Sequence, residues 1–316
     1  MEPIKTSKEW LALETSMRDD LSKYWGGDWG CDSEVGTLRT ILLRRPGEEI
    51  EHVKDPKKYR WIEIMDPKIA REQHDALAHL YRAYGVRVHY VEHVRKDRAN
   101  ALFLRDSVLM TPEGAVVGRQ AMACRRGEER YAAEALAALG VPIIRTISST
   151  GIFETACLLW VDAETVIIGS GNRANAEGSL QIEEVLRPMG VEHFLYMQIP
   201  HGYAHIDSIV SFIGKKTAII DLARIPWDVW QALKQRGFKL LEAPSAEETE
   251  NLALNFVTLA PGSVLMASGF PQTKKFLMRH SVKVKEIDVS ELRKGWGSLH
   301  CMTAVLKRDP IGKLLK

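Results

Sequence analysis

The sequence lacks the features that mark several classes of protein. It has only four cysteines and no CxxC pair, too few for a disulfide framework or a structural zinc site. Its 43 basic and 41 acidic side chains nearly cancel, so charge does not favour nucleic acid or a membrane surface as a partner. No apolar run approaches the roughly 20 residues that span a bilayer, and the first ten residues lack the apolar segment of a signal peptide. We therefore expect a reduced, cytoplasmic protein.

The rest of the composition is typical of a folded globular protein. The sequence is 45% hydrophobic and 27% charged, which excludes disordered, collagenous and coiled-coil proteins. A chain of this length can form two domains or one large domain with a substantial core. No polar, proline-rich or serine-rich linker divides the sequence, so we predict a single domain over residues 1–316.

Strand and helix patterns alternate along the chain. Strand-like segments occur at 38–46, 86–94, 107–118, 164–171, 215–222 and 262–270. Helical patterns occur at 67–85, 130–140, 175–190 and 227–237, and a strand follows each of them within a few residues. The order strand, turn, strand, helix, strand repeats about every 50 residues, a period that indicates a propeller or another array. The glycines of 169–178 do not form GxGxxG, so we interpret them as a strand-to-helix turn and not as a dinucleotide site.

Four residues that could do chemistry lie at nearly the same phase of this repeat. They are separated by 48, 51 and 96 residues, the last gap being close to two units: Asp106, Glu154, His205 and Cys301. Modules around one axis would bring a nucleophile, an acid/base and two carboxylates to one centre. Each residue alone has a plainer interpretation: a buried thiol, a structural histidine, a strand-end cap or a solvated carboxylate. Their common phase favours a shared site.

Several segments occur in the order in which one enzyme family carries them. They are SEVGTLRTILLRRPGEEIEHV (33–53), EQHDALAHLYRAYGVRVHYV (72–91), ANALFLRD (99–106), FET (153–155), NR (172–173), HID (205–207) and GWGSLHCMT (295–303). On these segments the chain resembles the guanidine-modifying enzymes of the pentein superfamily: arginine deiminases, dimethylarginine dimethylaminohydrolases and amidinotransferases. The resemblance implies a five-bladed α/β propeller of ββαβ modules, with residues 1–32 as an N-terminal extension.

The resemblance also implies roles for the site residues. A guanidinium carbon is a poor electrophile, so Cys301 would attack as a thiolate and form a covalent S-alkylthiouronium. His205 would protonate the leaving amine and then deprotonate water, and Glu154 would orient His205. Asp106 and Asp207 would bind guanidinium nitrogens through charge-assisted hydrogen bonds. The partner would be a small guanidino compound, and neither a metal nor an organic cofactor would be needed.

Other positions imply the class of substrate. In the family, two arginines take the substrate carboxylate, and here they would be Arg125 and Arg173, each 19 residues after its acid. A surface salt bridge is the plainer interpretation of either arginine alone. Asn100 matches an asparagine that contacts the substrate in arginine deiminases. The resemblance therefore implies an arginine-like amino acid as the substrate.

Differences among the relatives favour a compact arginine-deiminase-like hydrolase. Dimethylarginine hydrolases generally lack the acid present here as Asp207, and amidinotransferases usually have Asp in place of Glu154. Arginine dihydrolases, which give ornithine, tend to carry Asn in place of Asp106. An amidinotransferase and a dihydrolase remain the alternatives. Ribosome-associated factors share the propeller without the acid, histidine and cysteine set, which argues against a pure binding module.

Two residues depart from the family pattern, and a few others leave their roles open. Cys157 stands where the family has a second acid, and Trp296 lies within what is often a run of glycines. We interpret His300 as structural, because neighbouring residues in a strand point to opposite faces. His201 and Tyr203 are candidates to cover the site from a loop. The oligomeric state is not readable from the sequence, and a homodimer is one option.

Overall fold

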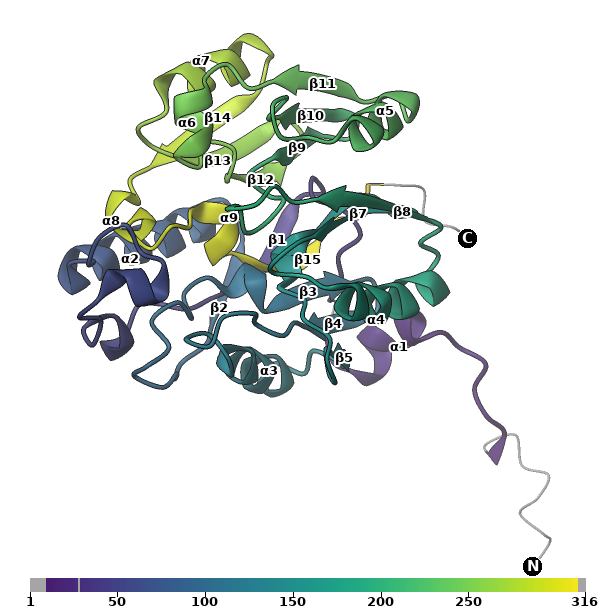
Figure 1. Cartoon of the computed structure of the whole chain (residues 1–316). Coiled ribbons are helices and arrows are strands. Elements are labelled where there is room, and N and C mark those ends of the chain that lie inside the picture. Colours follow the sequence, from purple (N-terminus) through teal and green to yellow (C-terminus); the bar gives the residue numbers. More distant parts are fainter. Residues whose placement is uncertain (1–9, 28, 312–316) are drawn as a thin grey trace, which may run out of the picture.

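The computed structural model describes residues 10–27 and 29–311, and these fold into five small sheets of three strands each. In four of the sheets the first two strands form an antiparallel hairpin, and a helix then leads to a third strand parallel to the second. Helices α2, α3, α4, α5 and α7 lie on the periphery, whereas α9 lies towards the middle (Figure 1). This order is the predicted strand, strand, helix, strand unit.

Four modules are continuous in the chain, and their bounds are as follows. The first contains β3 (Val108–Thr111), β4 (Gly114–Val117), α3 (Glu128–Ala138) and β5 (Ile143–Thr146). The second contains β6 (Leu158–Asp162), β7 (Thr165–Ser170), α4 (Ala176–Leu186) and β8 (His193–Gln198). The third contains β9 (Val210–Gly214), β10 (Thr217–Ile220), α5 (Trp227–Gln235) and β11 (Lys239–Glu242). The fourth contains β12 (Val257–Ala260), β13 (Ser263–Ala267), α7 (Pro271–Arg279) and β14 (Lys283–Ile287).

The fifth module joins the two ends of the chain. Strand β15 (Ala304–Arg308) pairs antiparallel with β1 (Leu38–Leu43), and β1 pairs parallel with β2 (Arg87–Tyr90) after α2 (Pro67–Ala83). The remaining helices lie outside the modules or between them: α1 (Met17–Tyr24), α6 (Ala246–Glu250), α8 (Ser290–Arg293) and α9 (Leu299–Met302). Because β15 supplies the first strand of this sheet, residues just before β15 take the same place as residues before β3, β6, β9 and β12.

Local sequence explains where these elements begin and end. Helix α2 starts at Pro67, and the Asp66 side chain accepts hydrogen bonds from the next two free backbone N–H groups. It ends before Gly85, whose φ of 77° suits a residue without a Cβ. In the hairpin of β3 and β4, Gly114 has φ 146°, and a Cβ there would lie 2.5 Å from the carbonyl oxygen of Pro142. The predicted helices and strands are confirmed with ends that differ by a few residues, except that the segment 107–118 forms two strands of a hairpin, β3 and β4, and not one strand.

The middle strands of the sheets are buried along most of their length. All four residues of β4 and the first five of β7 are buried, as expected for strands covered on both faces. Third strands such as β5 and β8 are partly exposed, because they form the outer edges of their sheets. No helix in the described ranges combines the length and apolarity needed to cross a membrane.

Candidate active site

Residues that precede the first strand in four of the five modules meet in one pocket. Asp106 ends a short 3-10 helix before β3, and Glu154 directly precedes another before β6. His205 lies in the loop before β9, and Cys301 lies in α9 before β15. All four line one hollow with about 430 Å³ of empty space, its open mouth included, which we call the shared pocket. A common position in the module thus brings together residues nearly 200 positions apart.

His205 and Glu154 form a short contact in the shared pocket. His205 Nε2 lies 2.7 Å from Glu154 Oε2, and the other carboxylate oxygen accepts hydrogen bonds from the Ala121 N–H at 2.9 Å and Arg173 at 3.2 Å. Burial alone would lower the pKa of His205, but Asp106 and Glu154 raise it above its ordinary value. Burial opposes ionisation of Glu154, yet the hydrogen bond and charge of His205 hold the pKa of this carboxyl well below its usual range. The pair therefore favours a charged imidazolium.

Asp106 presents a carboxylate oxygen that accepts no hydrogen bond from the described residues. Its Oδ2 accepts a hydrogen bond from Arg125 Nη1 at 2.5 Å, whereas its Oδ1 is buried and has no hydrogen-bond partner. The imidazole of His205 is close to Oδ1, with its Nδ1 3.6 Å away. An unpaired buried carboxylate oxygen is costly unless a ligand supplies a donor. Asp106 can therefore receive a donor from a molecule in the shared pocket.

The surroundings of the Cys301 thiol favour its neutral form. Its Sγ lies 3.7 Å from Asp207 Oδ2, and the residue is 8% exposed. Burial raises the pKa of Cys301 far above its ordinary value, and the charges of Asp207 and Asp106 raise it further. A cation entering beside Cys301 would offset these charges and favour the thiolate.

Asp207 lies close to Cys301 but is not among the described residues that line the shared pocket. It lines a smaller neighbouring cavity together with His300 and Glu34. His300 Nδ1 lies 2.8 Å from Asp207 Oδ2, and its Nε2 lies 3.5 Å from Glu34. The prediction that His300 is structural assumes a strand around Cys301. That assumption is wrong, because Leu299–Met302 is a turn of helix. A helical turn leaves His300 free to contact the carboxylate beside Cys301.

Asn255 is a member of the site that the sequence analysis missed. It lies just before β12, at the position that Asp106, Glu154, His205 and Cys301 occupy in the other modules. The gap of 96 residues between His205 and Cys301 is two units long, and Asn255 stands close to its middle. Interpolating the repeat would have found it.

The two predicted carboxylate-binding arginines both line the shared pocket, but their partners differ. Arg125 is held by Asp106, by Glu128 at 2.8 Å and by two backbone carbonyls. Arg173 donates to Glu154, and its Nε has no hydrogen-bond partner. Arg173 is therefore the freer of the two to bind an anion.

Asn100 and Arg60 form the part of the wall near Tyr59. The Asn100 amide is satisfied on both sides, accepting from Trp61 Nε1 at 2.5 Å and donating to the carbonyl of Tyr59 at 3.0 Å. Arg60 also lines the shared pocket, although the sequence did not indicate it. Burial lowers the pKa of Arg60, and the positive charge of Arg173 nearby lowers it further. Arg60 and Arg173 thus place two positive charges at one part of the wall.

Trp296 forms another part of the wall. It has φ 62° and is 43% exposed, and the glycines on either side of it pack against Phe103. A Cβ at Gly297 would lie 2.3 Å from the Phe103 ring, so a side chain there would push the loop away. Among the described residues, the lining of the shared pocket includes neither His201 nor Tyr203. The Tyr203 hydroxyl instead donates to Glu250.

Cys157 is fully buried beneath the site. Its Sγ lies 3.9 Å from the carbonyl oxygen of Ala204, and burial, reinforced by Glu154, raises the pKa of the thiol far above its usual value. Cys157 therefore packs as a neutral side chain.

The acids and His205 could in principle hold a metal ion. One ligand atom from each of Asp106, Glu154 and His205 lies within 4.8 Å of the others. Arg125 and Arg173, however, already bind one oxygen of each acid, and their positive charges oppose a cation. The donor set suits an acid/base pair and a guanidinium ligand better than a metal.

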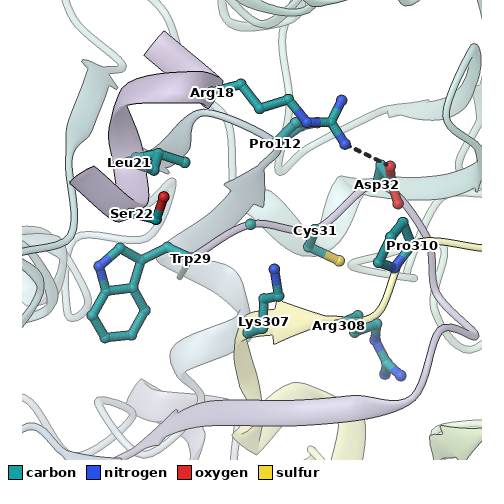
Figure 2. A pocket seen from close by; sticks show the side chains of 11 residues that line it. Arg18, Leu21, Ser22, Trp29, Cys31, Asp32, Pro112, Lys307, Arg308 and Pro310 are labelled. Atoms are coloured by element: carbon teal, nitrogen blue, oxygen red, sulfur yellow. Dashed lines mark ion pairs between the residues drawn. The ribbon is translucent and has the colours of Figure 1, made fainter. Parts of the chain in front are cut away.

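A second hollow lies below α1 and differs from the shared pocket in its chemistry (Figure 2). Arg18 on α1 reaches Asp32 at 3.7 Å across it, and Cys31 lies in its floor. Burial raises the pKa of Cys31 to about 12. No histidine is among the described residues that line this hollow, so its thiol has no imidazole partner like the one that His205 offers in the shared pocket.

Comparison with known proteins agrees with this geometry. The model of a family described as N,N dimethylarginine dimethylhydrolase, eukaryotic, matches residues 56–308, which is most of the chain. The chain belongs to this family. The dimethylarginine hydrolase family is one of the guanidine-modifying pentein enzymes, and its members are hydrolases that act on C–N bonds of amidines. The resemblance seen in the sequence is confirmed.

Individual relatives have low sequence identity to this chain, but they align with most of it. N(G),N(G)-dimethylarginine dimethylaminohydrolase of Streptomyces coelicolor is 25% identical over 85% of this chain and 97% of its own length. The structure of the Pseudomonas aeruginosa enzyme with citrulline has a TM-score of 0.70 at 22% identity, covering 85% of this chain and 99% of that one. The N-terminal domain of a cyanobacterial arginine dihydrolase has a TM-score of 0.74 at 18% identity, covering 87% and 99%. The two structures show that the mixed α/β fold is shared.

Proposed function

We propose that this protein is a cysteine-dependent hydrolase of the guanidino group of an arginine-like amino acid, with a covalent intermediate on Cys301. Asp106 carries the proposal, because it lines the shared pocket with Cys301 and His205 and its buried Oδ1 accepts no hydrogen bond from the described residues. A guanidinium group offers N–H donors and a positive charge in one plane. It would satisfy Asp106 and favour the thiolate in a single binding step.

The proposed chemistry proceeds in two stages. The Cys301 thiolate adds to the guanidinium carbon, the C–N bond to one amine breaks, and His205 protonates that amine as it leaves. The result is an S-alkylthiouronium. His205, now neutral, takes one proton from water, whose oxygen attacks the same carbon. The C–S bond then breaks, the remaining proton on that oxygen passes to solvent, and a ureido product and the thiolate are released. Glu154 keeps the ring of His205 in place through its contact of 2.7 Å.

Recognition of the rest of the substrate falls to the arginines. Arg173 and Arg60 present positive charge at one part of the pocket wall, and Arg173 Nε is unused. A substrate carboxylate would neutralise this pair. Arg125 and Asn100 support the same region, with Arg125 holding Asp106 and Asn100 holding the segment that carries Arg60. An amino acid with a guanidino end fits this distribution of charge.

The methylation state of the substrate does not follow from Asp207. Its Oδ2 already accepts from His300 and Asn255, and the residue lies outside the shared pocket lining among the described residues. Both L-arginine and its Nω,Nω-dimethyl derivative are therefore candidates. An amidinotransferase is a structural neighbour, with a TM-score of 0.72 at 15% identity, and transfer to an amine is the second candidate.

We also propose that the five sheets are the blades of a propeller around one axis. Contacts between β15 and β3, between β12 and β1, and between β12 and β9 support this arrangement, as does the meeting of first-strand residues in one pocket. The single domain with residues 1–32 as an extension, the cytoplasmic location and the homodimer stay predictions.

Product analysis tests the proposed function. Purified protein is incubated with L-arginine or dimethylarginine, and citrulline, ornithine, ammonia and dimethylamine are measured, with and without glycine or lysine as an amine acceptor. We expect citrulline together with ammonia or dimethylamine. Ornithine with two ammonia would identify a dihydrolase, and a new guanidino compound would identify a transferase. No product from either substrate would contradict the proposal.

Replacing the nucleophile tests the mechanism directly. Cys301→Ala should remove all turnover while the thermal unfolding midpoint stays close to that of the wild type, because a small buried side chain is replaced by another. Cys31→Ala is the matched control, since Cys31 is equally buried but lines the hollow below α1. Retained turnover in Cys301→Ala, or equal loss in Cys31→Ala, would rule out the assigned nucleophile.

A further inference from the structure

Asn255 uses both ends of its side-chain amide at the nucleophile. Its Oδ1 accepts a hydrogen bond from the backbone N–H of Cys301 at 3.2 Å, and its Nδ2 donates to Asp207 Oδ2 at 2.9 Å. Its own backbone carbonyl accepts from the N–H of His300 at 3.2 Å. The residue is 1% exposed, so these bonds form away from water, where they are strong.

These three bonds hold groups from three modules together. Asn255 precedes β12, Asp207 precedes β9, and Cys301 precedes β15. Helix α9 is only four residues long and its beginning has no side-chain cap, so its own hydrogen bonds hold Cys301 weakly. The Asn255 amide supplies the missing acceptor for the Cys301 N–H. It also sets the Asp207 carboxylate, whose Oδ2 lies 3.7 Å from the Cys301 sulfur.

We propose that Asn255 is a positioning residue for the nucleophile. It fixes the Cys301 backbone and the Asp207 carboxylate relative to each other. The thiol is thereby held at a set distance from a carboxylate whose negative charge is partly offset by hydrogen-bond donors. The proposal rests on the proposed function only in taking Cys301 as the nucleophile. Asn255 itself lines no part of the shared pocket among the described residues, so it acts through Cys301 and Asp207.

An amide suits this position better than other polar side chains. The Cys301 N–H requires an acceptor and Asp207 requires a donor, and an amide offers one of each on opposite sides. An aspartate at position 255 would keep the acceptor and lose the donor, and it would place a second negative charge beside Asp207. An alanine would lose both contacts and add no charge.

The charge balance beside the thiol gives the expected direction of the effect. Asn255 Nδ2 and His300 Nδ1 both donate to Asp207 Oδ2, the same oxygen that lies nearest the sulfur. The charge of Asp207 raises the pKa of Cys301, whereas the hydrogen bond to Asn255 lowers it. Glu34, Arg105 and Asp106 also act on this cluster, and Asn255→Asp or Asn255→Ala leaves them in place. Removing the Nδ2 donor should therefore disfavour the thiolate.

The test is the rate at which iodoacetamide alkylates Cys301, followed by mass spectrometry from pH 7 to 10 in the absence of any substrate. We expect alkylation about tenfold slower at pH 8 for Asn255→Asp, which corresponds to a pKa higher by about one unit. Asn255→Ala should show a smaller decrease in the same direction. In the guanidino assay both variants should lose at least tenfold in kcat, with KM within threefold of wild type.

Thr258→Val is the matched control. Thr258 lies in the same module and is equally buried, and its hydroxyl donates to the Phe212 carbonyl without contacting Cys301 or Asp207. Thr258→Val should lower the free energy of unfolding about as much as Asn255→Ala does, but it should leave the alkylation rate of Cys301 unchanged. If Asn255→Asp does not fold, Asn255→Ala removes the same donor and carries the test.

Two results would overturn the proposal. One is an alkylation profile of the folded Asn255 variants that superimposes on the wild-type profile. The other is an equal shift in Thr258→Val, which would mean that general loosening is responsible. Alkylation needs no guanidino substrate, so the two proposals can fail separately. If the wild-type protein hydrolyses no guanidino compound but the Asn255 variants are still alkylated more slowly, the proposed function is contradicted and the positioning role is supported.

Discussion

Two successive modules carry the same pair of residues and use it differently. In each, an acid before the first strand forms an ion pair with an arginine 19 residues later: Asp106 with Arg125, and Glu154 with Arg173. Both acids are buried and both arginines are about 5% exposed. The backbone arrangement is therefore repeated, and the difference in role comes from the groups around it.

The acids differ in which oxygens are free. Both oxygens of Glu154 are occupied, by His205 on one side and by the Ala121 N–H and Arg173 on the other. One oxygen of Asp106 is unpaired. Glu154 is thus committed to orienting a side chain of the protein, whereas Asp106 remains open to a ligand.

The arginines show the opposite pattern. Arg125 is fully engaged with two acids and two carbonyls, whereas the Arg173 Nε is unpaired. Each module therefore has one buried atom without a hydrogen-bond partner in a residue that lines the pocket, an acceptor in the first and a donor in the second. A guanidino acid, with a cation at one end and a carboxylate at the other, complements this arrangement.

Among substitutions of these two acids and two arginines, Glu154→Gln should cause the largest loss of activity. It removes the charge that holds His205 in its protonated, oriented form, so kcat should fall about 10²–10⁴-fold, the usual contribution of a general acid/base. KM should change little, because Glu154 offers no free atom to the substrate. Steady-state kinetics on the best substrate measures both constants. A rise in KM with kcat unchanged would mean that Glu154 binds the guanidinium, and the two acids would then be equivalent.

Asp106→Asn should lower kcat/KM about 10–100-fold, the value of a charge-assisted hydrogen bond. The loss should appear mainly in KM, in contrast to Glu154→Gln, because the free Oδ1 binds the ground-state cation. Isothermal titration of the Cys301→Ala protein with substrate checks the binding part without turnover. Unchanged affinity in that background would remove Asp106 from the guanidinium site.

The two arginines should separate binding from stability. Arg173→Gln should raise KM about tenfold for a carboxylate-bearing substrate, the worth of one such contact, and have little effect on KM for decarboxylated arginine. Arg125→Gln should instead destabilise the fold by about 3–5 kcal/mol, because it leaves Asp106 and Glu128 buried without their partner. Denaturant unfolding and kinetics on the two substrates distinguish these outcomes. Equal losses of stability in both variants would mean that the pairs are alike.

The pH dependence should show the smallest of these effects. His205 must be protonated to release the amine, and its pKa is raised by Asp106 and Glu154, so activity should persist above pH 6.5 and fall as pH rises through the raised value. Because the folded pKa of His205 is raised, its protonation also stabilises the fold. This stabilisation is fully present below the unfolded pKa of about 6.5 and is lost as the pH rises through the folded pKa. Glu154→Gln should shift the alkaline limb of the kcat/KM profile to lower pH by about one pH unit, the size expected for loss of one neighbouring charge. An unmoved limb would assign it to a group other than His205.

Much of the site followed from the repeat. Strand and helix periodicities gave the modules, and the common phase selected Asp106, Glu154, His205 and Cys301. This succeeded because short-range hydrogen bonding repeats the same backbone path in each module, so equal phase means equal place. Asn255 obeys the same rule and would have been found by filling the gap before Cys301. Arg60 obeys no such rule, since it lies in a loop outside the repeated unit.

The direction of individual side chains did not follow from the repeat. His300 was assigned to the far face of a strand, but the residues around Cys301 form a helical turn, and its ring meets Asp207. Asp207 is predicted to bind the guanidinium together with Asp106; its Oδ2 lies 3.7 Å from the Cys301 sulfur, and the residue lines the neighbouring cavity. In both cases the deciding contacts come from another module, about 90 residues away in the chain.

The sequence by itself determined the order of the modules, the buried strands and the residues that stand at the beginning of each first strand, because these depend on local periodicity and turn chemistry. Only the tertiary structure decided which oxygen of Asp106 is free, which arginine is fully paired, and that Asn255 joins Cys301 to Asp207. Those properties depend on which donors and acceptors from distant modules meet within about 3 Å, the range of a hydrogen bond. No local pattern encodes that meeting.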